Sequence, residues 1–116
     1  MKKKPLTSTV KVRISRNEGF FGPGIEELLR AVEETKTVKD AIVLAEMSYS
    51  KAWKLLDRAD RELGFPLLRR RKGGPKGGNC HLTPEGIDFL EKYEEMRKRV
   101  EVESEKIFQD VFKDYI

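Results

Sequence analysis

The segment from Ser48 to Leu63 constrains the fold of this chain more than any other stretch. Its apolar residues recur at three-, four-, seven- and eleven-residue distances from the first, which is the spacing of a single stripe on an α-helix. Ser48 suits the N-cap of that helix, because its hydroxyl can accept a free backbone N–H. The apolar stripe is Ala52, Leu55, Leu56, Ala59 and Leu63, and the opposite face carries Ser50, Lys51, Lys54, Arg58 and Arg61. One face is therefore suited to packing and the other to a negatively charged partner.

Positive charge is concentrated in the same region. The 116 residues carry a net charge of +4, but residues 48–79 hold nine Lys or Arg against three acids, whereas residues 80–116 are net acidic by four. Such a distribution is the electrostatic footprint of a nucleic-acid-binding surface. Hydrophobic and charged residues each make up 38% of the chain. This balance predicts one domain with a small core, extended by a long helix or by an oligomer.

The N-terminal part of the chain predicts a short flexible arm, a strand and a first helix. Residues 1–8 are polar and lysine-rich. From Thr9 to Ser15 apolar and polar residues alternate, which indicates a half-buried strand, and a turn is expected at 17–19. An apolar pair and the breaker Gly22-Pro-Gly24 then precede a helix predicted over 25–35, whose inward stripe is Ile25, Leu28, Leu29 and Val32.

A second short helix is predicted immediately before the segment at Ser48. Thr37 is a suitable N-cap, with Asp40 three residues on, and the apolar stripe of residues 38–45 spans about two turns. Glu46 and Met47 form the connection to Ser48. Two short helices joined by a turn of three or four residues are the helix-turn-helix unit, in which the second helix lies in the major groove of DNA.

A basic hairpin is predicted after the second helix of this unit. Gly64 and Pro66 end the helix, and residues 67–71 combine an apolar start with three arginines. Residues 72–79 form a glycine-rich basic loop, and residues 80–83 form the return strand. We interpret this hairpin as the wing of a winged helix.

The last helix is predicted from residue 84 to about 113. Thr83 is its cap, and Pro84 fits the first helical position, where no N–H is needed. A helix of this length exceeds what so small a domain can cover, so its outer half must fray or pack on another subunit. The candidate dimer-interface residues are Ile87, Leu90, Tyr93, Met96, Val100, Ile107 and Val111.

Several other function classes find little support in the sequence. Lys76 is followed by glycine and not by a helix carrying Ser or Thr, which disfavours a phosphate-binding loop. Cys80 and His81 stand alone, so we expect no metal site, no cofactor and no enzyme. No run of about 18 apolar residues and no signal sequence is present, and a single cysteine fits a reducing cytoplasm.

Four motifs resemble the N-terminal DNA-binding domain of ModE-type, molybdate-responsive regulators, a winged helix related to that of LysR-type regulators. They are Phe21-Gly-Pro-Gly24, Met47-Ser-Tyr-Ser-Lys-Ala-Trp53, Gly73-Gly-Pro-Lys-Gly-Gly78 and Leu82-Thr-Pro-Glu-Gly86, in the family's order and spacing. The resemblance implies a homodimer joined largely through the last helix, and DNA binding through the helix at Ser48 and the wing. By the resemblance we expect a DNA-binding domain without molybdate-binding domains, and molybdate binding is not carried over.

Together these patterns predict an α+β winged helix-turn-helix over residues 9–83 and a dimerisation helix over 84–116. We expect a cytoplasmic, homodimeric transcriptional regulator that binds a two-fold symmetric operator in double-stranded DNA, with no membrane partner. The candidate DNA contacts are Thr37, Ser48, Tyr49, Ser50, Lys51, Lys54, Arg58, Arg71, Lys72 and Lys76. We further expect Lys51 and Lys54 to be exposed on the side of the hairpin.

Alternatives remain open for these residues. The basic side chains would otherwise form a solvated helix face, in which Arg58 pairs with Glu62 and Arg61 with Asp57. Tyr49 would pack at the start of the helix, and Trp53 is expected in a core or hinge role. The whole chain would alternatively be a winged-helix protein–protein interaction module, or would bind an oxyanion at the glycines of the wing. An unidentified sensor or effector protein is a further partner left open.

Overall fold

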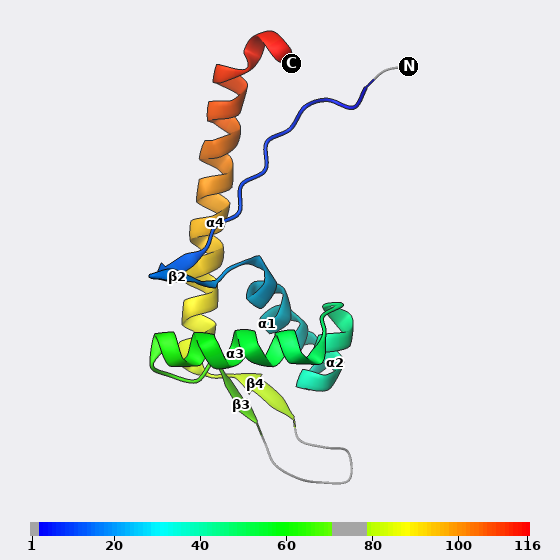
Figure 1. Ribbon diagram of the computed structural model, residues 1–116, viewed down its shortest axis with the longest axis vertical. Helices are drawn as coiled ribbons and strands as arrows, with labels where there is room; N and C mark the ends of the chain where they lie inside the picture. Colours follow the sequence, from blue (N-terminus) through cyan, green and yellow to red (C-terminus); the bar gives the residue numbers. More distant parts are fainter. Residues whose placement is uncertain (1–2, 71–78) are drawn as a thin grey trace.

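The computed structural model describes residues 3–70 and 79–116, and it has the predicted α+β composition (Figure 1). A small body is extended by one long helix, so that the molecule measures 61 × 36 × 22 Å. The elements in chain order are β1 (Ile14–Arg16), β2 (Glu18–Phe21), α1 (Pro23–Thr35), α2 (Val38–Leu44), α3 (Tyr49–Leu63), β3 (Leu68–Arg70), β4 (Cys80–Leu82), α4 (Pro84–Val111) and a 3₁₀ turn at Lys113–Tyr115.

The N-terminal strand is shorter than predicted, and a second strand pairs with it. The alternation over residues 9–15 indicated a strand throughout, but β1 begins only at Ile14. Its partner β2 is four residues long and includes Gly19, which was expected in a turn. The reversal takes place at Asn17, whose φ of 68° is left-handed, and Arg16 pairs with Glu18 across it. Because β2 is so short, the residues before Ile14 have no strand to pair with.

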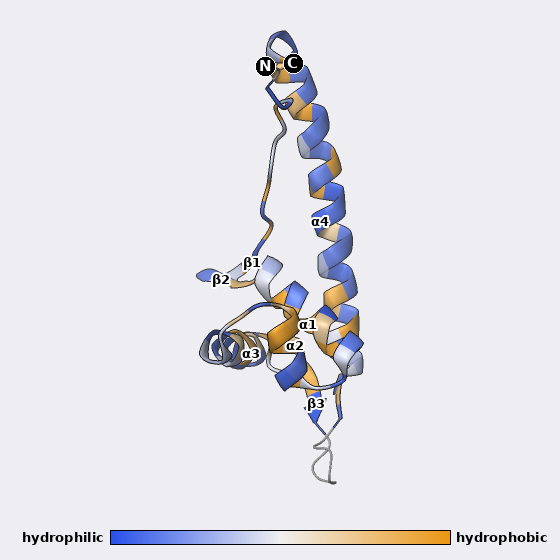
Figure 2. Ribbon diagram, turned by 90° about the vertical axis from the view of Figure 1, so that its right-hand side faces the viewer, coloured by the Kyte–Doolittle hydropathy of each residue, from blue (hydrophilic) through white to orange (hydrophobic). Residues whose placement is uncertain are grey.

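The core forms around α1. Its predicted stripe is buried, with Ile25, Leu28, Leu29 and Val32 fully inaccessible to solvent. Figure 2 shows hydrophobic residues gathered where α1, α2 and the first half of α4 come together. The aromatic rings of Phe89 and Tyr93 on α4 pack edge-on against Phe21 of β2, at centroid distances of 4.8 and 5.0 Å. The core therefore ties the N-terminal hairpin to the long helix.

Hydroxyl groups cap α2 and α3 as predicted. The Thr37 hydroxyl accepts a hydrogen bond from the Asp40 amide at 3.0 Å, and the Ser48 hydroxyl accepts one from the Lys51 amide at 3.1 Å. Glu46 takes a φ of 53° in the connection between the two helices. Gly64, with a φ of 80°, ends α3 and donates its N–H to the Asp60 carbonyl. These local signals fix the direction of α3 relative to α2.

The start of α4 is locked against β3. Thr83 is 2% exposed, and its hydroxyl donates to the Pro66 carbonyl at 2.7 Å while accepting from the Gly86 amide at 2.9 Å. Gly86 itself lies against the backbone of Leu67, the residue just before β3, since a Cβ on Gly86 would meet the Leu67 oxygen at 2.5 Å. Glycine at position 86 therefore permits the close contact between helix and hairpin.

The first half of α4 packs on the body, and this changes the interpretation of two predicted dimer residues. Leu90 and Tyr93 are each 1% exposed in the chain's own core, and the Tyr93 hydroxyl donates to the Val12 carbonyl at 2.9 Å. They are buried without a second copy because the helix face that carries them lies against α1 and β2. In the part of the chain that the structure describes, no helix is long and apolar enough to cross a membrane.

Ion pairs reinforce the contact between α1 and α4. Arg97 donates to the Glu26 carboxylate at 2.9 Å, and Arg30 pairs with both Glu94 and Glu33. The hydrogen bond from Arg30 lowers the pKa of Glu94, whereas burial raises the pKa of Glu26. Charged residues thus complete the contact along the edge of the apolar core.

A pair of glycine substitutions tests how tightly α4 sits on the hairpin. We expect Gly86→Ala to destabilise the fold by about 1–3 kcal/mol, because the added methyl overlaps a backbone carbonyl that cannot move freely. Gly24→Ala is the matched control, since its nearest neighbours are side-chain atoms at 3.7 Å. That change should be neutral or stabilising by up to about 1 kcal/mol. Urea unfolding measures both, and equal effects would contradict the close contact.

Candidate nucleic-acid interface

The outer face of α3 is exposed and cationic. The buried side of the helix is formed by Ala52, Leu56 and Ala59. Ser50, Lys51 and Lys54 are all exposed on the opposite side, as predicted. Arg58 is half-buried and pairs with Glu18 of β2 at 3.4 Å rather than with Glu62.

The other predicted pair, Arg61 with Asp57, is not found among the ion pairs of the described residues. Glu62 forms an ion pair with Arg16 of β1, at 3.3 Å. In both pairs the partner of the α3 residue, Glu18 or Arg16, comes from the N-terminal hairpin, which sequence spacing within α3 alone cannot reveal. The pairs are exposed, and each contributes about 0–1 kcal/mol.

One edge of the α3 face meets β3 through a cation–π contact. The Trp53 ring packs edge-on against Tyr49 at 6.0 Å, and the Arg70 guanidinium lies 4.2 Å from the Trp53 ring centre. Trp53 is half-buried and packs against the core, in agreement with its predicted core or hinge role. Tyr49, Trp53, Lys54 and Arg70 together line an open groove. Lys54 therefore lies on the hairpin side of the helix, as predicted.

The β3–β4 hairpin is anchored to the helices at both of its strands. The Asp60 carboxylate of α3 accepts the Leu67 amide at 3.0 Å, and burial raises the pKa of this carboxyl. On the other strand, the Cys80 amide donates to the Lys36 carbonyl at the end of α1, at 2.7 Å. The strands are antiparallel with Arg69 opposite His81. The predicted contacts Arg71, Lys72 and Lys76 lie outside the described residues.

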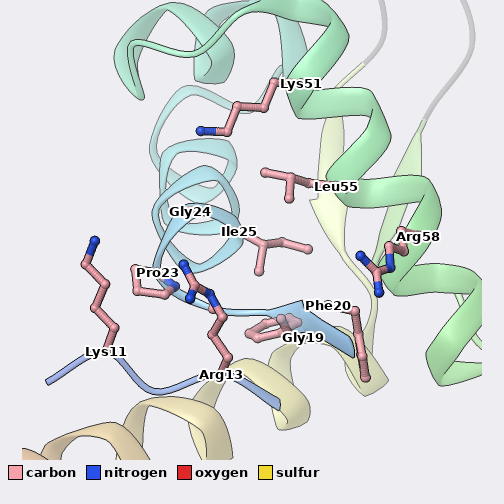
Figure 3. Close-up of a pocket in the computed structure, with 12 residues that line it drawn as sticks. Lys11, Arg13, Gly19, Phe20, Pro23, Gly24, Ile25, Lys51, Leu55 and Arg58 are labelled. Atoms are coloured by element: carbon pink, nitrogen blue, oxygen red, sulfur yellow. The ribbon is translucent and has the colours of Figure 1, made fainter. Parts of the chain in front are cut away.

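The other edge of the α3 face borders a cavity of about 300 Å³ with basic walls (Figure 3). Lys51 and Arg58 reach it from α3, and Lys11 and Arg13 reach it from the N-terminal segment, with Pro23 and Gly24 between them. Lys51 is thus exposed but faces the N-terminal segment rather than the hairpin. Sequence reasoning missed Lys11 and Arg13, whose only signal was their position on the polar side of an alternating stretch.

Three predicted contact residues, Thr37, Ser48 and Tyr49, lie at the starts of α2 and α3. The hydroxyls of Thr37 and Ser48 each accept one helix N–H group, so each still has its O–H to donate and one lone pair to offer a ligand. Tyr49 is exposed on the hairpin side. The structure therefore brings Tyr49, Ser50 and Lys54 together with Arg70 on the hairpin side of α3. Lys51 lies at the other edge of the same helix, and Thr37 lies one helix earlier.

The fold and this surface define a class: an α+β domain that exposes a capped, cationic helix between two small hairpins. No protein-family model matches the chain. The chain is nevertheless 31% identical over 94 residues to the molybdenum transport protein ModE of Herbaspirillum seropedicae, covering 81% of this chain and 33% of that protein. It is 28% identical over 110 residues to the transcriptional regulator ModE of Haemophilus influenzae, covering 95% of this chain and 42% of that protein.

A third relative is the transcriptional regulator ModE of Yersinia pestis, 29% identical over 75 residues. The matched part is 65% of this chain and 28% of that protein. The resemblance predicted from the four motifs is therefore confirmed: the chain is a relative of part of the ModE-type regulators. It spans between 28% and 42% of the length of these relatives.

The thiol of Cys80 offers a test of how β4 is placed. Cys80 is 2% exposed, and burial raises the pKa of its thiol despite the opposing effect of Arg70. Because the thiolate is the reactive form, we expect the native chain to react with a disulfide reagent at neutral pH at least about tenfold more slowly than the urea-unfolded chain. The unfolded chain is the internal control, and equal rates would contradict the burial of β4.

Proposed function

We propose that this chain is a winged helix-turn-helix domain of a DNA-binding transcriptional regulator, with α3 as the recognition helix and the β3–β4 hairpin as its wing. The observation that carries the proposal is the exposed face of α3, on which Lys51 and Lys54 form no ion pair with the described carboxylates. Two of the relatives bear the name transcriptional regulator. Their name and the charge of this face support the same function.

The dimensions and chemistry of α3 suit the major groove of B-DNA. That groove is about 12 Å wide and accepts an α-helix, whose diameter with side chains is about 10–12 Å. Lysine donates to guanine O6 and N7, and serine hydrogen-bonds to several bases or to phosphate. Ser50, Lys51 and Lys54 lie in the first two turns of α3, which is where base contacts of recognition helices arise. Tyr49 contributes an exposed apolar ring beside them.

A second copy of the chain is proposed to pack on the outer half of α4. Among the candidate dimer residues, Met96, Val100, Ile107 and Val111 are exposed, as is Ile87 nearer the body. Val100, Ile107 and Val111 continue the side of the helix that carries the buried Tyr93, at about 100° per residue. Such a stripe suits a helix-to-helix contact. A homodimer would set two recognition helices about 34 Å apart, in successive major grooves of a two-fold symmetric operator.

The double change Lys51→Ala with Lys54→Ala tests the assignment of α3. Each good base contact contributes about 1–3 kcal/mol, so we expect at least about a thirtyfold loss of affinity for an operator selected from a random pool. The matched control is Lys92→Ala with Lys106→Ala, which removes the same charge from exposed positions on α4. Fluorescence anisotropy measures both. Equal affinity of the two double variants would count against α3 as the recognition helix.

The alternative function is a winged-helix module for protein–protein contact, favoured by the acidic residues 80–116. A titration of the unmodified chain with random duplex DNA at 50 mM salt separates the two functions. A DNA-binding domain should bind the duplex with micromolar or tighter affinity, whereas a protein–protein interaction module should not bind it.

Two exposed apolar residues on α4 provide a matched test of the dimer. Ile107 is 60% exposed on the proposed stripe, and Val102 is 54% exposed at about 140° around the helix from it. We expect Ile107→Glu to convert a dimer to a monomer, because a charge would be buried in the interface. Val102→Glu should leave the dimer intact. Sedimentation velocity measures both, and a monomeric unmodified chain would contradict the proposal.

A further inference from the structure

The basic cavity beside α3 is built by packing. The aliphatic part of the Arg13 side chain lies across the backbone of β2 and of the turn before α1. A Cβ on Gly22 would meet the Arg13 Cγ at 2.9 Å, and one on Gly19 would meet the Arg13 Cδ at 3.1 Å. Two glycines therefore make room for this side chain and hold its guanidinium at the cavity (Figure 3).

Four cationic groups converge on this cavity from separate parts of the chain. Lys11 and Arg13 precede β1, whereas Lys51 and Arg58 belong to α3. Among the described residues, only Arg58 of these four has an ion-pair partner, the largely exposed Glu18. Like charges gathered around a hollow raise the local positive potential and attract an anion, and the N-terminal turn of α1 at Pro23 and Gly24 adds to that potential.

The position of the cavity relative to α3 indicates which anion it receives. A helix that lies in the major groove has one sugar-phosphate strand along each of its edges. The β3–β4 hairpin and Arg70 border one edge of α3, and the cavity borders the other. Arginine suits a phosphate particularly well, because its guanidinium can donate two parallel hydrogen bonds.

We infer that Lys11, Arg13 and Arg58, at the cavity that Lys51 also borders, bind a backbone phosphate of the DNA duplex on the side of α3 opposite the wing. The N-terminal segment is then a second backbone-binding element. The inference rests on the proposed DNA-binding function. Because phosphates carry no base identity, this contact positions the domain and strengthens binding to all sequences alike.

Removing the two N-terminal cations tests the inference without altering α3. One neutralised phosphate contributes about 0.9 to the slope of log K against log salt, so Lys11→Gln with Arg13→Gln should lower that slope by about 1 for each protomer bound. At 0.15 M salt this corresponds to about a fivefold weaker binding, for random and selected duplexes alike. The matched control, Lys92→Gln with Lys106→Gln, removes equal charge away from the cavity and should retain the full slope. Anisotropy titrations between 50 and 200 mM salt measure both.

The outcomes separate this inference from the proposed function. If the unmodified chain binds no DNA, the function itself fails. If the unmodified chain binds and the Lys11→Gln, Arg13→Gln variant keeps its slope, or loses no more than the control, the inference alone is overturned. Circular dichroism of the Lys11→Gln, Arg13→Gln variant verifies that it is folded.

Two further measurements address the position of Arg13 and the source of the phosphate. Gly22→Ala keeps the net charge but displaces Arg13, and it should also reduce the salt slope; an unchanged slope would overturn the positioning of Arg13 by the glycines. Inorganic phosphate at millimolar concentration should not raise the melting temperature of the free chain. A phosphate-dependent rise that is lost in the Lys11→Gln, Arg13→Gln variant would instead identify a site for a free anion.

Discussion

The burial of one face of α3 against α1 is the interaction on which the rest of this surface depends. Ala52, Leu56 and Ala59 are buried in the same hydrophobic cluster as the stripe of α1. Burying a leucine side chain contributes about 1.5–3 kcal/mol. It also fixes the rotation of α3 about its own axis. Once that rotation is fixed, Lys51 and Lys54 must face outward, and the two edges of their face must meet different neighbours.

The two neighbours of α3 are held by different kinds of contact. On the hairpin side, Asp60 binds the Leu67 amide and Arg70 stacks on Trp53. On the other side, exposed ion pairs connect Arg16 and Arg58 to carboxylates across the gap between β1–β2 and α3. A part-buried hydrogen bond is lost less readily than an exposed ion pair, which is screened by salt. The hairpin edge is therefore the more rigid of the two, while the N-terminal edge can adjust to a ligand.

Local signals in the sequence were sufficient for most of the fold. The caps Thr37, Ser48 and Thr83 each have a hydroxyl that bonds the amide three residues on, so the starts of three helices were predictable. The strand before Ile14 was overestimated, because strand length depends on a partner that alternation does not reveal. The basic cavity was not predictable either, since Arg13 and Lys51 are 38 positions apart and meet only through the packing of α1. The wing positions Arg71, Lys72 and Lys76 remain predictions.

The long helix α4 links stability to assembly. Its first half is stabilised by Leu90, Tyr93 and the ion pairs to α1, but its outer half has no core of its own chain to cover it. Ion pairs along the outer helix, such as Arg97 with Glu101, each add about 0.2–0.5 kcal/mol, which offsets little of the entropy of ordering several turns. An apolar stripe that continues the buried side of α4 into solvent would be covered by a second copy. Because the first turn of α4 lies directly against Leu67 just before β3, at Gly86, pairing two such helices would also fix the distance between two hairpins. The affinity of a dimer for DNA would then depend on the rigidity of α4, because this helix would set the distance between the two DNA-binding surfaces.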